Sequence, residues 1–228
     1  MSMPLVSVII PVHNGERFLK EAIESVLQQS YHPVETIVVN DGSTDNSAQI
    51  AASYKTTRTI DQSNQGQAAA LNAGVLNSKG SLIAFLDADD LWPQDKLSLQ
   101  VEYLREHPEV DFVIGQMFNF LNTGITKFQP KTMDTARKEY VAMALGAILA
   151  RKEIFQKIGL FDPKYKRAKD VDWFIRAKEA GIQMAIIQKT LLYRRIHETN
   201  KSHGIKLRQH EFLRAVKSSI DRKRNRDI

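Results

Sequence analysis

Three aspartates gather at the end of an apolar run, in the segment FLDADD at residues 85–90. Alternate residues of a strand point the same way and lie about 6.5–7 Å apart, so Asp87 and Asp89 can share one face. Like charges at the edge of an apolar core repel each other and lose hydration, which a bound cation would compensate. The alternative is a polar loop start in which Asp90 caps a following helix.

Two other predicted strands end in similar polar chemistry. The strand at 6–12 runs into His-Asn-Gly-Glu at 13–16, and the strand at 34–40 runs into Asp-Gly-Ser at 41–43. In open parallel sheets, ligands bind outside the carboxyl ends of the strands. We therefore expect one site at this edge of the sheet, to which all three segments contribute.

Two absent glycine motifs narrow the class of ligand. The sequence has no G-x-G-x-x-G after the first strand, which argues against a dinucleotide-dependent dehydrogenase, and no G-x-x-x-x-G-K-[ST], which argues against a P-loop NTPase. Phosphates would then have to be neutralised by a metal ion that the aspartates hold. A ligand set made only of oxygens suits Mg²⁺ or Mn²⁺, which keep coordination positions for water and substrate phosphates.

Strands and helices alternate through the first half of the chain. Continuous β-branched runs predict buried strands, and apolar residues at helical spacing predict amphipathic helices. This alternation with short turns indicates βαβ units, and hence an α/β fold with a mainly parallel, Rossmann-like sheet flanked by helices. The expected strands are 6–12, 34–40, 57–62, 81–86 and 110–120, and the expected helices are 17–29, 46–54, 64–80 and 95–106.

The second half of the chain is less regular. An acidic first turn and a glycine stop predict a helix at 170–181. The other expectations are a polar excursion at 121–139, a strand or helix passing into a helix at 141–159, one or two closing strands at 182–196 and a basic amphipathic helix at 205–222.

The bulk composition is that of a soluble globular protein of one domain. Of the 228 residues, 43% are hydrophobic and 25% charged, and the absence of cysteine excludes disulfides and thiolate chemistry and fits a reducing compartment. The N-terminal apolar stretch resembles a core strand rather than a signal peptide, and no apolar run approaches the ~20 residues that span a bilayer. The net charge of +6 lies in residues 201–228, so the rest of the chain offers no basic face for a nucleic acid.

Several motifs, taken together, resemble those of family 2 glycosyltransferases, which have the GT-A fold. The resemblance begins with SVIIPVHNGERFLKEAIESVLQQSYHPVETIVVNDGSTDNS and ends near LLYRRIHETNKS, so that it covers roughly residues 5–202. Between them, in the family's order and spacing, come NQGQAAALNAG, LIAFLDADDLW, GAILARKEIFQKIGLFDP and KDVDWFIRAKEAG. The roles in the following paragraphs are those that this resemblance implies.

The resemblance implies that the first strand edge and the Asp-Gly-Ser segment hold a nucleotide. Asp41 would hydrogen-bond the base, usually uracil, as a charge-assisted acceptor. For Gly66 and Asn72 a capped, tightly packed helix start is an equal alternative. The implied nucleotide-side residues are Pro11, Val12, Asn14, Glu16, Asp41, Gly42, Ser43, Asn64, Gly66, Asn72, Asp87 and Ala88.

The D-x-D element of the family matches Asp87 and Asp89. Asp89 would bind the Mn²⁺ or Mg²⁺ ion that bridges the donor diphosphate, and Asp87 would face the ribose or the waters on the metal. Asp90 is left as a local cap. His197, which with Asn200 matches a late segment of the family, would be a third metal ligand or a diphosphate contact, with a structural or exposed histidine as the alternative.

The acidic residue that serves the family as general base matches Asp170. A carboxylate near the acceptor hydroxyl takes its proton as the sugar carbon is attacked. Asp172, two residues on, is a rival, and a helix N-cap is the structural alternative for Asp170. The family commonly has Glu where this chain has Lys169, whose ammonium would favour the charged carboxylate and weaken it as a base.

The basic C-terminal segment has two interpretations. Its apolar stripe would rest on an anionic membrane, as expected if the acceptor is lipid-linked. Alternatively, the helix docks on its own domain. The stripe consists of Leu207, Phe212 or Leu213, Val216 and Ile220.

The predicted function is that of an inverting, metal-dependent hexosyl- or hexosaminyltransferase. It would move a sugar from a nucleoside diphosphate donor, UDP first, to a hydroxyl on a glycan or lipid-linked glycan, in cell-surface polysaccharide or glycolipid synthesis. We expect a cytoplasmic protein with a peripheral contact at the inner membrane face. Residues 1–204 would form one GT-A domain, with a nucleotide-binding half at 1–107 and an acceptor-side half at 108–204, and 205–228 a basic tail.

Two alternatives to this function stay open. A degenerate sugar-nucleotide-binding module has Lys169 as its only support. A sugar-1-phosphate nucleotidyltransferase would need a glycine- and arginine-rich loop after the first strand, and PVHNGERF has one glycine and one arginine without that spacing.

Overall fold

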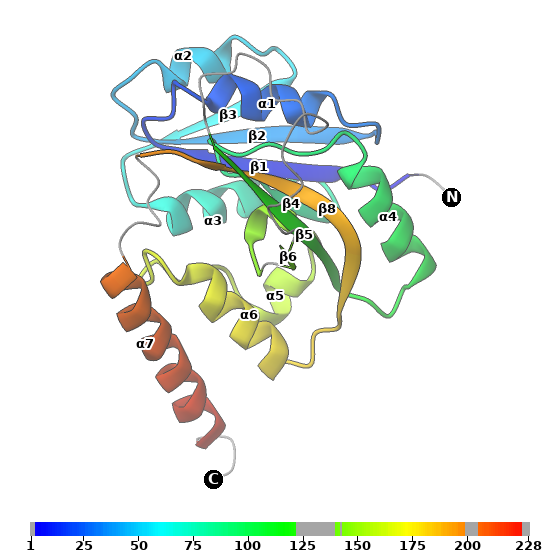
Figure 1. Ribbon diagram of the computed structural model, residues 1–228, viewed down its shortest axis with the longest axis vertical. Helices are drawn as coiled ribbons and strands as arrows, with labels where there is room; N and C mark the ends of the chain where they lie inside the picture. Colours follow the sequence, from blue (N-terminus) through cyan, green and yellow to red (C-terminus); the bar gives the residue numbers. More distant parts are fainter. Residues whose placement is uncertain (1–2, 122–139, 142, 199–204, 225–228) are drawn as a thin grey trace.

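One twisted sheet organises the computed structural model, which describes residues 3–121, 140–141, 143–198 and 205–224 (Figure 1). Across these residues the strand order is β3-β2-β1-β4-β7-β5-β6, and β8 pairs with β5. The pairs β1–β2, β1–β4, β2–β3 and β5–β8 are parallel, whereas β7 runs antiparallel to both β4 and β5. The short strand β7 therefore joins the parallel strands β3, β2, β1 and β4 to the second half of the sheet.

The first half is a set of βαβ units. All seven residues of β1 are buried, because helices cover both faces of the strand. Val8 and Ile10 pack with α1, and Ile9 packs with α3 on the opposite face. The elements are β1 (Val6–Val12), α1 (Leu19–Leu27), β2 (Val34–Asp41), α2 (Ser47–Ala52), β3 (Thr57–Gln62), α3 (Gln67–Asn77) and β4 (Leu82–Phe85).

Helix α3 lies unusually close to the sheet. A Cβ atom added to Gly74 would lie 2.4 Å from Cγ2 of Ile9, so only glycine allows this approach. This close packing holds α3 against β1, and Gln67 at the start of α3 lines the candidate site.

The second half adds the remaining strands and a helical layer. Its elements are α4 (Lys96–Glu106), β5 (Phe112–Leu121), β6 (Tyr140–Val141), the 3-10 turn η2 (Leu145–Ala147), β7 (Leu149–Arg151), α5 (Ile154–Ile158), α6 (Lys169–Glu179) and β8 (Met184–Ile196). Trp173 of α6 is completely buried among Phe112, Phe155 and Phe161, with ring centroids 5.3–5.9 Å apart. This aromatic cluster anchors α6 under the sheet.

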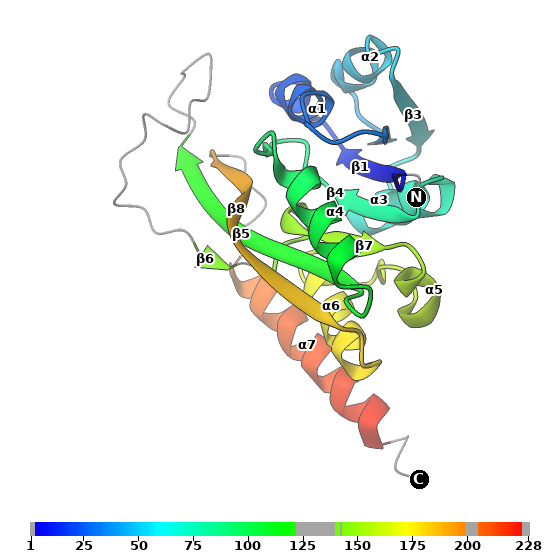
Figure 2. The ribbon, with the colours of Figure 1, turned by 90° about the vertical axis from the view of Figure 1, so that its right-hand side faces the viewer.

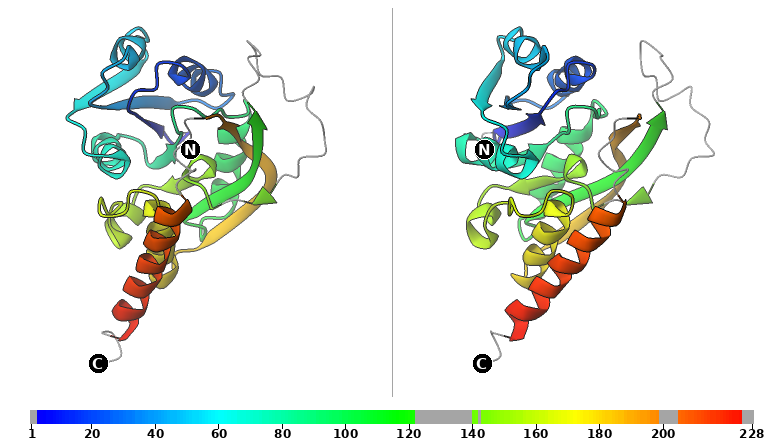
Figure 3. Two further views of the ribbon diagram at one scale, coloured as in Figure 1. Left: turned by 60° about the vertical axis from the view of Figure 1, so that its left-hand side comes forward. Right: turned by 90° about the vertical axis from the view of Figure 1, so that its left-hand side faces the viewer.

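Helix α7 (Ile205–Arg224) runs beside α6, and its C-terminal end extends beyond the rest of the fold (Figures 2 and 3). Glu211 and Ala215 are buried against the domain, and Arg222 pairs with Glu179 at 2.8 Å. Phe212, Leu213 and Ile220 remain exposed. Among the described residues, no helix is both long and apolar enough to cross a bilayer.

Most of the predicted elements are confirmed, and three regions need comment. The region 182–196 is a single strand, β8, and 141–159 consists of the turn η2, strand β7 and helix α5. The predicted excursion at 121–139 falls, apart from Leu121 at the end of β5, outside the described residues. The prediction that Asp90 is a local cap is wrong, because α4 begins only at Lys96 and the carboxylate of Asp90 accepts the backbone N–H of Arg195 at 2.9 Å.

Candidate active site

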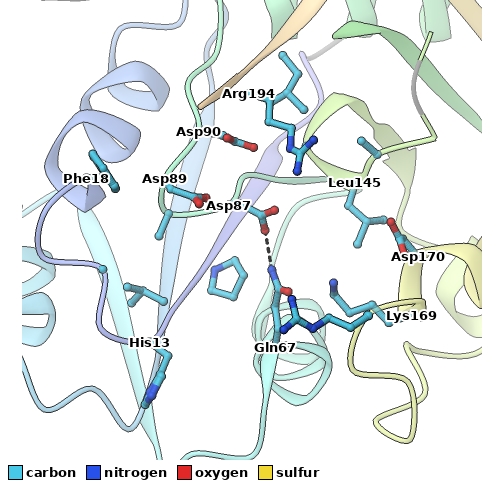
Figure 4. Close-up of a pocket in the computed structure, with 18 of the residues that line it drawn as sticks. His13, Phe18, Gln67, Asp87, Asp89, Asp90, Leu145, Lys169, Asp170 and Arg194 are labelled. Atoms are coloured by element: carbon cyan, nitrogen blue, oxygen red, sulfur yellow. Dashed lines mark hydrogen bonds between the residues drawn. The ribbon is translucent and has the colours of Figure 1, made fainter. Parts of the chain in front are cut away.

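A cavity of about 710 Å³ lies at the carboxyl ends of β1 and β4. Figure 4 shows Asp87, Asp89 and Asp90 in the middle of this pocket, with Lys169 and Asp170 across from them. The aspartates follow β4, Asp170 lies in the first turn of α6, and His197 follows β8. The pocket thus collects residues from both halves of the sheet.

The acidic cluster offers carboxylate oxygens to a common point. One ligand atom from each of Asp87, Asp89 and Asp90 can be chosen so that all three lie within 4.8 Å of one another. Asp87 is exposed and accepts a hydrogen bond from Nε2 of Gln67 at 2.6 Å (Figure 4). Asp89 is half-buried, with Oδ2 3.0 Å from Nε2 of His197. This set of hard oxygens with one imidazole beside it fits Mg²⁺ or Mn²⁺.

Asp90 lies beneath the other two aspartates. Burial raises the pKa of its carboxyl well above the ordinary value, and the charges of Asp89 and Asp87 raise this pKa further. Its hydrogen bond from the backbone N–H of Arg195 ties the D-x-D loop to β8. Asp90 is therefore a structural support of the cluster.

Arg195 holds the acidic loop from behind. Its guanidinium is buried between the rings of Phe18 and Phe120, 4.6 and 4.8 Å from their centroids. Nε donates to the backbone carbonyl of Asp89 at 2.9 Å, and Nη2 donates to Glu21 at 2.7 Å. One side chain thereby fixes the position of Asp89 relative to α1. Sequence reasoning missed this role, because nothing in the RRIH segment distinguishes Arg195 from Arg194.

Five of the predicted nucleotide-side residues line the pocket, namely Pro11, Val12, Asn14, Asp87 and Ala88. Asn14 has a positive φ of 53° and exchanges hydrogen bonds with the Asp-Gly-Ser-Thr turn, since Ser43 Oγ accepts its N–H and its own Oδ1 accepts the N–H of Thr44. Gly42 has φ 68°, and a Cβ there would lie 2.7 Å from the backbone N of Asn64. These contacts hold the first two polar segments together.

The other predicted nucleotide-side residues do not line the cavity. Asp41 is buried, and its carboxylate accepts the N–H groups of Gln65 and Gly66 at 2.8 and 2.9 Å. Glu16 binds Asn46 at the start of α2. Asn72 makes a reciprocal pair with the backbone of Phe161, at 2.8 and 2.9 Å. Glu16, Asp41, Gly42, Ser43, Asn64, Gly66 and Asn72 are all absent from the cavity lining.

The two candidate base residues occupy different environments. Asp170 lines the pocket, and its carboxylate accepts the N–H of the adjacent Val171 at 3.0 Å. Asp172 is buried outside the pocket and pairs with Arg176 at 2.8 Å, and this arginine also donates to the carbonyls that end α5. Asp172 thus holds α6 to the preceding loop, and only Asp170 of the two faces the cavity.

Several cations line the same cavity, and of these the sequence analysis singled out Lys169 alone. Arg17 follows β1, Lys166, Arg167 and Lys169 precede or begin α6, and Arg194 lies near the end of β8. They are far apart in the sequence, so no local spacing could have grouped them. Together they make the pocket suitable for an anionic ligand such as a diphosphate.

A buried polar network supports the wall of the pocket at Leu145 and Gly146. Lys96 is completely buried, its Nζ donates to Ile148 O and Gln100 Oε1, and burial lowers its pKa well below the ordinary value. Trp92 Nε1 donates to Gly146 O at 2.8 Å, and Gln100 Nε2 donates to Ala147 O at 2.9 Å. Three consecutive carbonyls are therefore held by side chains from α4 and the loop before it.

Known proteins share both this fold and this sequence pattern. The family model for glycosyl transferase family 2 matches residues 7–159. An uncharacterized glycosyltransferase of Rickettsia prowazekii (strain Madrid E) is 32% identical over 225 residues, covering 92% of this chain and 70% of that protein. An uncharacterized glycosyltransferase of Haemophilus influenzae is 42% identical over 152 residues, covering 64% of this chain and 59% of that protein.

Solved structures agree on the fold. The chain superimposes on S. aureus TarS 1–349 in complex with UDP with a TM-score of 0.69 at 19% identity, over 91% of this chain and 70% of that one. The mannosyltransferase PcManGT from Pyrobaculum calidifontis, in complex with GDP-Man and Mn²⁺, gives a TM-score of 0.69 at 20% identity, over 93% and 63% of the two chains. The fold and its acidic edge thus define a GT-A type glycosyltransferase.

The chain belongs to glycosyl transferase family 2, as the family match over most of its length and the Rickettsia relative both show. The resemblance seen in the motifs is confirmed, and so are the α/β GT-A fold and the assignment as a glycosyltransferase.

Proposed function

We propose that this protein is an inverting, metal-dependent glycosyltransferase that takes its sugar from a UDP-sugar. The observation that carries the proposal is the position of Asp170, which faces the acidic cluster across one cavity. A carboxylate on that side can serve an acceptor hydroxyl while the donor diphosphate lies at the aspartates. TarS, with a related fold, has been solved with UDP and with UDP-GlcNAc, which supports UDP as the nucleotide.

The donor nucleotide would lie along the ends of β1 and β4. Pro11, Val12 and Ala88 line the cavity there and would contact the base and ribose. Asp41 stays our proposed partner of the uracil ring, because each carboxylate oxygen has more than one lone pair and, among the described residues, Oδ2 accepts one donor, the N–H of Gly66. The other predicted nucleotide-side residues would shape this edge by fixing its turns.

A divalent cation would be held by Asp89, with Asp87 and His197 beside it. Mn²⁺ is our first choice and Mg²⁺ the second; PcManGT, of related fold, was solved with Mn²⁺. When bound, such an ion supplies charge stabilisation to the departing diphosphate. Arg195 fixes the loop that carries Asp89, and the contact with Phe18 orients His197 with a ring-centroid distance of 4.8 Å.

The residues of this chain would carry out a single displacement. Asp170 accepts the proton of the acceptor hydroxyl, whose oxygen forms a bond to the sugar carbon as the bond from that carbon to the diphosphate oxygen breaks. The nucleoside diphosphate leaves, and the sugar carbon is inverted. Arg194 and the cations at the start of α6 lie where they can neutralise the anionic groups of the substrates.

Turnover of a donor panel tests this function. We expect the protein to release UDP from a UDP-hexose or a UDP-N-acetylhexosamine in the presence of Mn²⁺, and not to release GDP from GDP-mannose at a comparable rate. UDP binding without turnover of any donor would favour a degenerate binding module. Pyrophosphate formation from UTP and a sugar 1-phosphate would indicate a nucleotidyltransferase instead.

The wider setting is part of the same proposal. Residues 1–204 would be the catalytic domain, with donor residues mainly in 1–107 and acceptor residues mainly in 108–204, and 205–228 would be an appended basic segment. The acceptor would be a glycan or lipid-linked glycan in cell-surface polysaccharide or glycolipid synthesis. A cysteine-free chain with a basic amphipathic helix fits a cytoplasmic enzyme that contacts the inner membrane face.

Vesicle binding should depend on the exposed apolar residues of α7. Phe212 and Leu213 are 47% and 65% exposed, with Arg214 and Lys217 exposed nearby. We expect flotation with vesicles containing anionic phosphatidylglycerol, loss of most binding in Phe212→Ser/Leu213→Ser, and weakening at high salt. Leu76→Ser, which removes an apolar side chain that is 69% exposed on α3, is the control and should bind like wild type. Equal flotation of both variants would contradict the membrane contact.

A further inference from the structure

A carboxylate from α7 lies at the loop that leads into α6. Glu211 is buried, with 5% of its surface exposed, and its side chain accepts the backbone N–H groups of three consecutive residues. The donors are Lys166 at 3.2 Å, Arg167 at 2.6 Å and Ala168 at 3.1 Å. Ala168 is the residue immediately before α6, so the carboxylate also lies at the positive end of that helix.

The same loop forms the pocket wall that carries the candidate base. Lys166, Arg167, Lys169 and Asp170 all line the cavity. Glu211, which does not line the cavity, holds the backbone N–H groups of Lys166 and Arg167, two of the residues that do line it. Tyr165, just before them, makes a second contact with α7 through its hydroxyl, 3.2 Å from Ser218 Oγ.

We propose that Glu211 is a positioning residue for catalysis, which makes α7 a working part of the active site. The inference rests on the proposed function, in which Asp170 is the base. Three charge-assisted hydrogen bonds from one carboxylate define the backbone path into α6. A base must be held close to its productive geometry, because a displacement of about 1 Å costs on the order of a hundredfold in rate. Glu211 supplies that precision without touching the substrates.

The substitution Glu211→Gln tests the proposal. The amide keeps one acceptor oxygen and sets an NH₂ group against the remaining backbone donors, so the loop loses part of its hold. With the UDP-sugar that wild type turns over fastest, we expect kcat to fall ten- to hundredfold while the donor KM and the affinity for UDP with Mn²⁺ change less than twofold. The amides of residues 166–168 should exchange faster with deuterated water.

The matched control is Arg222→Gln. It breaks another polar anchor of α7, the pair between Arg222 and Glu179, without touching the loop before α6. Its kcat should stay within twofold of wild type, although this substitution, like Glu211→Gln, removes a contact that docks α7. A milder variant, Glu211→Asp, keeps the charge with a shorter reach and should lie between wild type and Glu211→Gln.

The outcomes separate this inference from the proposed function. If wild type turns over no donor, the proposed function fails and the inference falls with it. If wild type is active, Asp170→Asn is inactive and Glu211→Gln turns over like Arg222→Gln, only the positioning role is refuted. A drop in UDP affinity that matches the drop in kcat would also refute it, since it would point to general damage to the pocket.

Discussion

Asp170→Asn should reduce sugar transfer by about 10²–10⁴-fold while leaving the affinity for UDP and Mn²⁺ unchanged, because a general base contributes about that much and the donor does not need it to bind. The amide is almost the same size and keeps the hydrogen bond from the N–H of Val171. The measurement is kcat for UDP release, together with isothermal titration of UDP in the presence of Mn²⁺.

Asp172→Asn should have the opposite effect to Asp170→Asn, since it should lower stability rather than activity. Asp172 is buried outside the cavity and paired with Arg176, so its loss should lower stability by on the order of 3 kcal/mol and leave kcat of the folded protein near wild type. If Asp172→Asn abolishes transfer at full stability while Asp170→Asn does not, the base assignment moves by two residues.

Asp89→Ala should abolish the stabilisation that UDP gives in the presence of Mn²⁺. With UDP at about 100 times its dissociation constant, wild type should gain about 2.7 kcal/mol, or roughly 5–10 °C in Tm for a chain of this size. The gain should disappear in EDTA, and Asp89→Ala should show little of it, because Asp89 is the proposed link between cation and diphosphate. Each shift is measured against the ligand-free Tm of the same variant, since the substitution also removes the contact with His197.

Asp95→Ala is the control for the loss of a nearby carboxylate. Asp95 is exposed just before α4 and lies outside the cavity lining. The Asp95→Ala variant should keep the full increase in Tm that UDP gives in the presence of Mn²⁺. A shift of wild-type size in Asp89→Ala, or in wild type with EDTA, would refute the metal assignment.

The regular part of the fold could be predicted because its signals are local. Buried strands such as β1 are continuous β-branched runs, and α1 carries apolar residues at helical spacing, so element types followed directly from the sequence. The elements within 141–159 could not be assigned from the sequence, because η2, β7 and α5 are too short to show a period of their own and β7 is fixed by its pairing with β4 and β5.

The residues of the candidate site could be predicted where they belong to a recognisable sequence motif. Asp87, Asp89, Asp170 and His197 belong to recognisable segments, and the structure brings all four to one cavity. Arg195 and Glu211 were not predictable, since their partners lie 106 and about 44 residues away in the sequence and no spacing links them. Asp90 was misassigned for the same reason, because its partner at Arg195 is 105 residues distant.

The long strand β8 sets a minimum length for a working enzyme. The family match stops at residue 159, yet β8 returns to the acidic edge much later. There Arg195 of β8 supplies the N–H that Asp90 accepts and the guanidinium that binds the carbonyl of Asp89, and His197, just after β8, places its imidazole beside Asp89. A polypeptide shortened to the matched segment would keep the parallel strands β1 to β4. It would lose the contacts of the D-x-D loop with Arg195 and the pairing of β5 with β8. Residues up to at least His197 therefore belong to the smallest fragment worth expressing.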